Sequence, residues 1–395
     1  MTSKVQMDTE PGTHTLREQF LLDPTVTFLN HGSFGACPAP VFDTYQSWQR
    51  ELESNPVHFV DHILRPALGV ARERLAVFVG ASAEQLVFVP NATYAINAVA
   101  RSIKLEPGDE VLGTNHEYGA VNNTWRFVCQ KQGAHYIQAT FGIPVSDKQS
   151  IVEAIWSQVT ERTRVICMSH ITAPTALILP VEEICRRARE AGIVTVIDGA
   201  HALGQIDLAL NEIGVDYYTG NAHKWLCAPK GSAFLYSHVG PETKLEPLVV
   251  SHGWSNTTSN SRLDDYYLWT GTMDPSAYLS VPAAIDFVEE HDWSSVRASC
   301  HALASTLRRE LEAFSGRESV CPDSTEWYSQ MFTAFLPEPP VEDMRGRLWD
   351  EYRIIVPVHR FGDEIPLVRV SIQAYNTQED ADRLLTALNE IYSGT

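Results

Sequence analysis

Between about residues 60 and 240, short apolar runs alternate with longer stretches whose apolar residues recur at helical spacing. Such runs, bounded by Gly, Pro, Asn or His, are typical of buried strands. Strands that alternate with helices predict crossovers and a mostly parallel sheet covered on both faces. The expected strands are 86–89, 110–113, 164–168, 193–197 and 233–236, and the expected helices are 64–79, 120–130 and 181–191. Because ligands of such folds bind beyond the carboxyl ends of the strands, the polar residues after each run are the first candidates for a site.

The pattern changes after about residue 240, where a polar stretch at 255–261 precedes a long helical stretch that follows Pro275. The last hundred residues combine expected helices at 296–314 and 378–391 with expected strands at 331–336, 354–358 and 368–372. This pattern predicts a smaller α/β domain. We therefore expect an N-terminal arm (1–27), a large domain (28–290) and a small C-terminal domain (291–395).

Charge and cysteine content exclude several classes of function. The chain has 30 basic and 49 acidic residues, a net charge of −19, which would repel a phosphate backbone or an anionic membrane surface. Its seven cysteines are odd in number, lie far apart and include no Cys-x-x-Cys pair, which argues against a disulfide framework or a zinc site. We see no secretory signal and no apolar run long enough for a membrane span. A cytoplasmic protein that binds neither nucleic acid nor membrane is expected.

Two strand ends carry an ionisable residue. Asp198 directly follows the run 193–197, and Lys224 lies 26 residues later, among small and aromatic residues before the next run. Taken singly, a carboxylate there is commonly a turn or cap residue, and a lysine is nearly always solvated. Here Trp225, Leu226 and Cys227 follow the lysine. They favour a partly buried amine, and burial lowers the pKa of an amine and makes it a usable nucleophile or base.

Two further strand ends offer different chemistry. Residues 90–93 place small polar residues at the start of an expected helix, where free backbone N–H groups and the helix dipole can bind a phosphate. Tyr118 follows the run 110–113 and can stack on a flat ring. An ordinary helix cap and a core aromatic residue are the plain alternatives. In combination, the four ends match the needs of pyridoxal phosphate: a lysine for its Schiff base, a carboxylate for its pyridine nitrogen, a phosphate site and a stacking platform.

These features resemble the class V aminotransferase-like proteins of pyridoxal-phosphate fold type I, and within them the isopenicillin N epimerases and the related carbon–sulfur lyases such as the hercynylcysteine sulfoxide lyases. The resemblance implies a large domain with a mostly parallel seven-stranded sheet between helices, a small C-terminal α/β domain, and pyridoxal phosphate as the cofactor. The shared stretches are 28–35, 91–93, 116–120, 198–201, 221–226, 271–272 and 369–371.

The resemblance implies a role for each residue around the cofactor ring. Lys224 forms the aldimine with the cofactor and moves protons at Cα. Asp198 pairs with the pyridine nitrogen, His201 lies near the ring hydroxyl, and Tyr118 stacks on the ring. Thr172 is expected, on a looser alignment, to bond the ring hydroxyl.

The resemblance also implies which residues bind the phosphate. The phosphate takes donors from Ala92, Thr93, Asn221 and His223. Thr272 resembles the residue that reaches the phosphate of a neighbouring subunit, so a homodimer is expected.

Arg369 is expected to clamp the α-carboxylate of the substrate, because its planar fork makes two parallel bonds to a carboxylate. Asn30 and His31 are expected beside the substrate. A surface arginine on a strand is the plain alternative for Arg369.

Three reactions can follow removal of the Cα proton. Return of a proton to the opposite face inverts the centre and needs a second acid, for which Tyr118, His31 and His201 are candidates. Expulsion of a sulfur group from Cβ makes a carbon–sulfur lyase of S-substituted cysteines or their sulfoxides. Transamination is a third outcome and needs a second substrate. We rank the epimerase first and the lyase second. A cysteine desulfurase is disfavoured, because no cysteine follows Cys321 to accept the sulfur.

Overall fold

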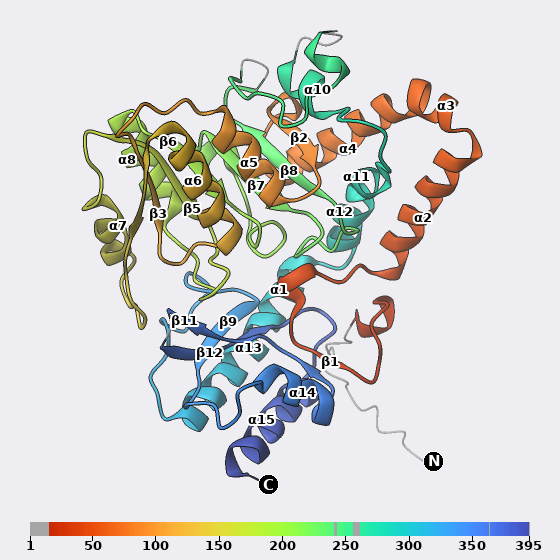
Figure 1. The fold of residues 1–395 in the computed structure, drawn as a ribbon. Coiled ribbons are helices and arrows are strands. Elements are labelled where there is room, and N and C mark those ends of the chain that lie inside the picture. The colour runs from red at the N-terminus through yellow and green to blue at the C-terminus, as the bar shows by residue number, and fades with distance from the viewer. Residues whose placement is uncertain (1–15, 241–242, 256–260, 363, 395) are drawn as a thin grey trace, which may run out of the picture.

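The computed structural model describes residues 16–240, 243–255, 261–362 and 364–394. These residues build two units, a larger one around a seven-stranded sheet and a smaller one around a three-stranded sheet (Figure 1). The first fifteen residues of the expected arm, and most of the polar stretch at 255–261, lie outside the described residues.

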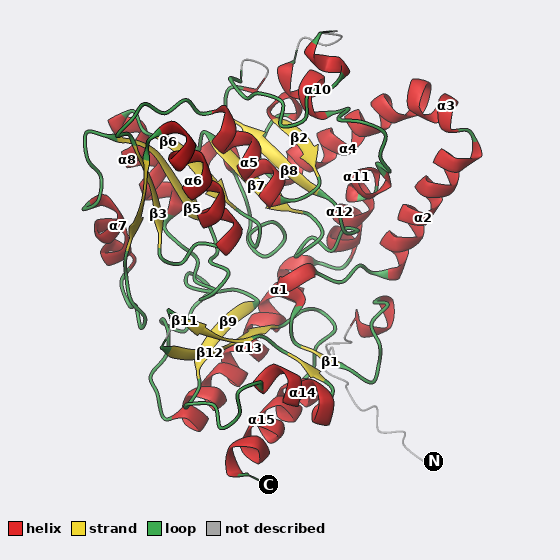
Figure 2. Cartoon of the chain, viewed as in Figure 1, coloured by secondary structure: helices red, strands yellow, loops and turns green. Residues whose placement is uncertain are grey.

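The large sheet has the predicted mostly parallel arrangement. Only β8 runs antiparallel to its neighbours, β2 and β7, whereas the remaining pairs are parallel. Helices lie on both faces of the sheet, as Figure 2 shows. In their order across the sheet, the strands are β2 Leu86–Val89, β8 Ala233–Ser237, β7 Tyr217–Asn221, β6 Val194–Asp198, β5 Thr163–Ser169, β3 Glu110–Thr114 and β4 His135–Ala139.

The apolar runs did not reveal two strands of this sheet. The strand β4 lies at the sheet edge, and four of its five residues are not fully buried, so its sequence contains polar residues that break an apolar run. The strand β7 is central, but Thr219, Gly220 and Asn221 interrupt its apolar character. The hydroxyl of Thr219 donates to the carbonyl of Phe234, which allows its burial in the sheet.

The predicted helices of this unit are present with small shifts at their ends, and α8 has the predicted bounds. Its C-terminus is set by Gly192, whose φ of +70° is the left-handed conformation that ends a helix. Short 3-10 turns occupy Leu16–Gln19, Ala83–Gln85 and His252–Trp254, and a π-helical turn occupies Phe59–Ile63. The helices are α1 His31–Phe34, α2 Ala39–Ser54, α3 Pro56–His58, α4 Leu64–Phe78, α5 Ala92–Ser102, α6 Gly119–Gln132, α7 Lys148–Trp156, α8 Val181–Ala191, α9 Leu210–Ile213, α10 Arg262–Tyr267, α11 Ser276–Leu279 and α12 Val281–Glu290.

The smaller unit contains the sheet β11-β12-β9, which is antiparallel throughout. The expected strand 354–358 is divided, because β10 pairs with the early strand β1 while β11 pairs with β12. Pro357 separates the two pieces and has no N–H to donate to a ladder. The elements are β1 Thr27–Phe28, α13 Trp293–Ser315, β9 Met331–Phe335, α14 Met344–Tyr352, β10 Ile354–Ile355, β11 Val358–Phe361, β12 Ile365–Ser371 and α15 Gln378–Ser393.

The large sheet separates two hydrophobic clusters. Along β2, Leu86 and Phe88 belong to one cluster, and Val87 and Val89 to the other, because side chains alternate between the faces of a strand. All seven cysteines are buried and unpaired. No helix among the described residues is long and apolar enough to cross a membrane.

Candidate active site

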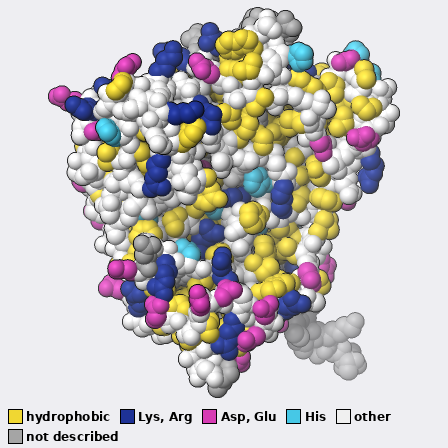
Figure 3. Space-filling view, viewed as in Figure 1, with side chains coloured by type: hydrophobic (Ala, Val, Ile, Leu, Met, Phe, Trp, Pro, Cys, Tyr) yellow, Lys and Arg dark blue, Asp and Glu magenta, His cyan; other side chains and the backbone are white. Residues whose placement is uncertain are grey.

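A cavity of about 410 Å³ lies where strands of the large sheet end. Its wall includes Ser169 at the end of β5, Asp198 at the end of β6 and Asn221 at the end of β7, with the turn 90–93 after β2. These strands are parallel, so their carboxyl ends lie at one edge. Arg369 on β12 of the smaller unit closes the cavity, and Figure 3 shows basic and histidine side chains in the hollow between the units.

The hydrogen bonds of His201 define the state of the Lys224 amine. The indole N–H of Trp225 donates to Nδ1 of His201 at 3.3 Å, so Nδ1 is an acceptor. Burial holds the pKa of His201 well below its usual value, so the ring is neutral and carries its proton on Nε2. That Nε2 lies 3.2 Å from Nζ of Lys224, so in this tautomer it can donate to the uncharged form of the amine. Burial also lowers the pKa of Lys224 to about 8, which favours the same uncharged form.

Asp198 is a buried carboxylate with spare acceptor capacity. One oxygen accepts the backbone N–H of Ala200 at 2.9 Å, the single hydrogen bond to this side chain among the described residues. Burial raises the pKa of Asp198, and the nearby Lys224 partly offsets that rise. A carboxylate in this position gains from any N–H group that enters the cavity, because burial without a partner is unfavourable.

The start of α5 offers donors to an anion. Asn91 caps the helix by accepting the N–H of Tyr94 at 2.9 Å, and the side chain of Asn221 accepts the N–H of Ala92 at 2.9 Å. Thr93 lines the cavity, and no hydrogen bond from its N–H or hydroxyl is present in the described chain. His223 donates from Nδ1 to the carbonyl of Ser232 at 2.9 Å, which leaves its Nε2 available.

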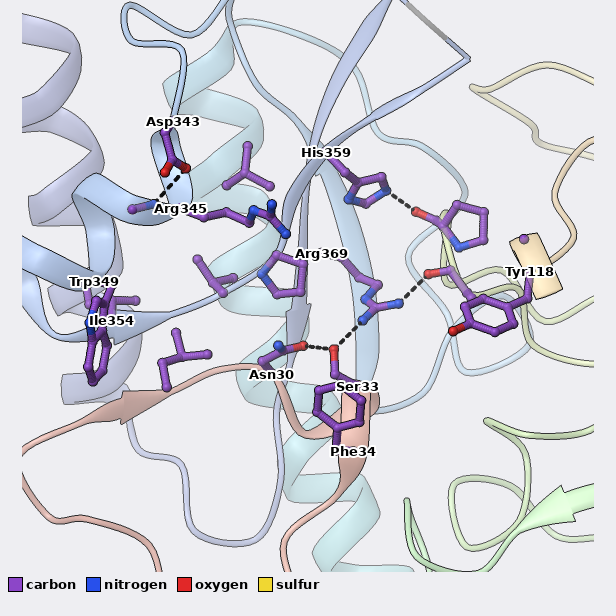
Figure 4. Close-up of a pocket in the computed structure, with 18 of the residues that line it drawn as sticks. Asn30, Ser33, Phe34, Tyr118, Asp343, Arg345, Trp349, Ile354, His359 and Arg369 are labelled. Carbon is purple, nitrogen blue, oxygen red and sulfur yellow. Dashed lines mark hydrogen bonds between the residues drawn. The ribbon is translucent and has the colours of Figure 1, made fainter. Parts of the chain in front are cut away.

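Arg369 is a buried cation without a carboxylate partner in the described chain. Its side chain donates to the carbonyl of Ala173 at 2.6 Å and to the hydroxyl of Ser33 at 3.2 Å (Figure 4). Its Nε is buried and has no hydrogen-bond partner among the described residues. Burial lowers its pKa to about 10, so it stays charged at neutral pH. An unpaired buried guanidinium favours binding of a carboxylate.

Neither Asn30 nor His31 lines this cavity, although Asn30 lines an adjoining one. The side chain of Asn30 accepts the hydroxyl proton of Ser33 at 2.7 Å and so orients a partner of Arg369. His31 is fully buried, with Nδ1 2.9 Å from the hydroxyl of Tyr375 and Nε2 2.9 Å from the carbonyl of Lys224. His31 therefore holds the backbone of the lysine loop and does not line the cavity.

A glycine allows the N-terminal segment to approach that loop. Gly35 has a φ of +71°, and a Cβ atom there would lie 1.9 Å from the carbonyl oxygen of His223. Only glycine fits this contact, so the stretch 30–35 and the lysine loop are held against each other.

Thr172 and Thr272 do not line the cavity. The Thr172 hydroxyl is fully buried, lies 2.7 Å from the hydroxyl of Thr175 and accepts the N–H of Leu177 at 2.9 Å. Its predicted bond to a ring hydroxyl gains no support from this geometry. Thr272 is exposed, on a segment away from its own cavity, so its expected contact requires a second subunit.

The cavity also contains residues that the sequence analysis did not assign. Ser169 follows an expected strand, so the search of strand ends could have found it. Its hydroxyl donates to the carboxyl of Glu117 at 2.7 Å, and the hydroxyl of Thr114 donates to the same carboxyl at 2.6 Å. Burial raises the pKa of Glu117 to about 7. Ser33, the partner of Arg369, gave no signal of its own beyond its place in the stretch 28–35.

Comparison with known proteins identifies the same family that the sequence motifs resemble. Residues 30–384 match the family Aminotransferase class-V. The isopenicillin N epimerase of Amycolatopsis lactamdurans is 39% identical over 95% of this chain and 97% of its own length. A probable chloroplastic L-cysteine desulfhydrase of Arabidopsis thaliana is 28% identical over 93% of this chain and 83% of its own. A solved structure of a C-DES variant, with glycine covalently linked to its pyridoxal-phosphate cofactor, superposes with a TM-score of 0.83 at 19% identity, covering 95% and 99% of the two chains. The predicted fold type is thereby confirmed.

Proposed function

The chain belongs to the aminotransferase class-V family, and from this premise we propose that it is a pyridoxal-phosphate enzyme that removes and returns the Cα proton of an amino acid or aminoacyl peptide, as an epimerase does. One observation carries the proposal. The Lys224 amine, whose pKa is lowered by burial, and the guanidinium of Arg369, which has no carboxylate partner among the described residues, line the same cavity. A base for a proton and a clamp for a carboxylate are the two groups that such a reaction requires.

The residues present fit the cofactor. The Asp198 carboxylate has room for an N–H donor such as a protonated pyridine nitrogen, and Thr93 at the start of α5 has free donors for a phosphate. Tyr118 lines the cavity as an aromatic surface, with 53% of the residue exposed. When bound, pyridoxal phosphate supplies an electron sink for the bond that breaks at Cα. Asp198, Thr93, Asn221, His223 and Lys224 are the residues proposed to hold it.

Four side chains have distinct roles in the proposed reaction. Arg369 binds the α-carboxylate and fixes the orientation of Cα. The Lys224 amine accepts the Cα proton, because burial lowers its pKa to about 8 and so leaves more of the uncharged form near neutral pH than an ordinary lysine has. His201 donates to that amine and keeps its lone pair directed, while Trp225 fixes the tautomer of His201.

The return of a proton to the opposite face requires a second group. Both ring nitrogens of His31 form hydrogen bonds with other protein atoms, and His201 is hydrogen-bonded to Lys224 itself. Neither histidine is therefore free to deliver a proton to the opposite face. Tyr118 lines the cavity and can reach solvent. Of the three candidates from the sequence, we therefore propose Tyr118 as the second proton donor.

A carbon–sulfur lyase is the second candidate, favoured by the desulfhydrase relative. That reaction needs the same base and carboxylate clamp, together with a sulfur leaving group at Cβ. Cysteine desulfurase activity is disfavoured. The seven cysteines are all buried, none lines this cavity in the described chain, and burial raises the pKa of Cys37 to about 12.

We also propose a homodimer in a reducing compartment such as the cytoplasm. The exposed Thr272 could serve the phosphate site of a second subunit, and Met273 beside it is 37% exposed. Seven buried, unpaired thiols are consistent with reducing conditions.

One proton-NMR time course in heavy water tests the proposed reaction. The cofactor-loaded protein is incubated with aminoadipyl peptides, L-amino acids, S-substituted cysteines and their sulfoxides. Deuterium at Cα of a surviving substrate, with loss of stereochemical purity, is expected. Formation of pyruvate from a cysteine derivative without such exchange would identify the lyase, and Lys224→Ala should abolish either reaction.

A further inference from the structure

A second cavity, of about 770 Å³, adjoins the first. The two share Ser33, Phe34, Tyr118, Ala173 and Arg369, so Arg369 lies at the passage between them. The lining of the second cavity excludes Lys224 and includes residues of α14, such as Arg345 and Trp349, and the segment that connects β10 and β11 in the smaller unit (Figure 4). We call it the outer cavity.

The outer cavity has mostly apolar walls. They favour a ligand with a carbon chain or ring between its polar ends. The apolar lining residues include Phe34, Trp349, Ile354, Ile355, Val356, Pro357 and Val358.

One charged side chain of the outer cavity has no internal partner. Arg345, from the first turn of α14, points into the cavity in Figure 4, and no ion pair or hydrogen bond of its guanidinium is present among the described residues. Among the described residues, the lining contains two acids. Asp343 caps α14, where it accepts the N–H of Gly346 at 2.9 Å, and Glu117 accepts the hydroxyl protons of Ser169 and Thr114. His359 donates to the carbonyl of Pro174 at 2.8 Å, and burial lowers its pKa, so it adds no charge at neutral pH.

Two arginines thus face connected cavities in a protein of net charge −19. Arg369 is assigned to the α-carboxylate of the substrate. A second free guanidinium, separated from it by apolar walls, calls for a second anionic group at the far end of the same molecule.

We propose that the outer cavity binds the distal part of an elongated amino-acid or aminoacyl-peptide substrate, whose terminal carboxylate pairs with Arg345 while the reacting end is held by Arg369. This assignment rests on the proposed function. A short substrate such as cysteine would reach neither the apolar walls nor Arg345. The outer cavity therefore favours an elongated substrate over cysteine itself.

The test compares two ligands that differ at one end. Calorimetric titration of the cofactor-loaded protein is carried out with an α-aminoadipyl dipeptide that ends in a free carboxylate, and with the same dipeptide as its terminal amide. The wild-type protein should bind the acid about tenfold or more tightly than the amide, the typical value of a charge-assisted bond. Arg345→Gln should bind the two alike, with its affinity for the amide unchanged.

Arg347→Gln is the matched control. Arg347 lies on the same helix but pairs with Glu351 at 3.1 Å, outside the cavity. This variant should keep the preference for the acid. Equal binding of acid and amide by the wild-type protein, or a preference that survives in Arg345→Gln, would overturn the assignment.

Exchange of the Cα proton for deuterium, measured on the same samples, separates the two proposals. If exchange occurs without an acid preference, the distal site is wrong and the proposed reaction stands. If the acid preference depends on Arg345 but neither peptide exchanges, the distal site stands and the proposed reaction is wrong.

Discussion

At the scale of the residue, Lys224 shows how a neighbour's hydrogen bond defines a protonation state. Trp225 can only donate, so His201 must accept at Nδ1 and donate from Nε2 to the amine. Burial is the main cause of the lowered pKa of Lys224, and Arg369 lowers it further, whereas Asp198 raises it. The sequence shows a lysine next to Trp225, but the direction of the hydrogen bond depends on how the two ring side chains and the amine meet in the folded chain.

The pH dependence of Lys224 reactivity follows from these causes. Only the uncharged amine reacts in reductive methylation, so the rate in the cofactor-free protein should rise with pH and reach half its maximum near pH 8, not near 10.5. Arg369→Gln removes a cation and should move that midpoint to higher pH. Asp198→Asn removes an anion and should move it to lower pH. Mass spectrometry of the Lys224 peptide measures the rate, and a midpoint that the two variants shift in the same direction would contradict this account.

At the scale of the element, the start of α5 combines a structural and a binding role. The Asn91 side chain caps the helix, while the adjoining Thr93 donors remain free. A carbonyl oxygen and a carboxylate cap a helix equally well, but only the carboxylate would repel a bound phosphate. The two roles can therefore be separated by substitution.

Asn91→Asp should leave the free energy of unfolding almost unchanged and weaken pyridoxal-phosphate binding about tenfold, because it places a negative charge beside the proposed phosphate site. Asn91→Ala should lower the free energy of unfolding by about 1 kcal/mol. Asp147 caps α7 far from the cavity, so Asp147→Ala should also destabilise the protein while cofactor affinity is retained. Urea unfolding and cofactor titration give the two quantities. Unaltered cofactor binding in Asn91→Asp would exclude this end of α5 as the phosphate site.

At the scale of the whole molecule, the reaction cavity is assembled from distant parts of the chain. Ser33 lies near the N-terminus, Lys224 in the large unit and Arg369 near the C-terminus, and Gly35 permits the close approach of the first to the second. The smaller unit contributes Arg369 and Arg345, so the relative position of the units defines the distance between the two proposed carboxylate sites. If Thr272 contacts the phosphate site of a partner, the cavity also depends on a second copy of the chain.

If Thr272 serves the partner's phosphate site, two defective proteins should complement each other. Thr272→Asp should weaken cofactor binding about tenfold or more by charge repulsion, and Lys224→Ala should lose covalent attachment of the cofactor after borohydride reduction. Unfolding and refolding the two together should form hybrid dimers with one intact site each. Cofactor titration then measures the affinity of the intact site, and intact mass after borohydride reduction measures the covalent attachment of the cofactor. Absence of recovery in a mixture shown to be dimeric by sedimentation would exclude Thr272 from a shared site.

The sequence by itself predicted five of the seven strands of the large sheet and several helices, because apolar runs and helical spacing indicate which faces are buried. Polar residues at strand ends pointed to residues 90–93, Tyr118, Asp198 and Lys224, because such ends meet at one edge of a parallel sheet. His201, Asn221, His223 and Arg369 came from the family resemblance. The apolar runs missed β4 and β7, whose polar residues break an apolar run, although their burial is supported by neighbours distant in sequence.

Tertiary structure decided what each of these residues can do. His31 lies in a shared stretch and Thr172 was expected on a looser alignment, yet both are fully buried and hydrogen-bonded to protein atoms. Arg345 belongs to no shared stretch and lines the outer cavity. The physical reason is that hydrogen bonding, desolvation and the pairing of charges depend on which groups lie within a few ångströms of each other. Spacing along the chain predicts that proximity only within one element or at a shared sheet edge.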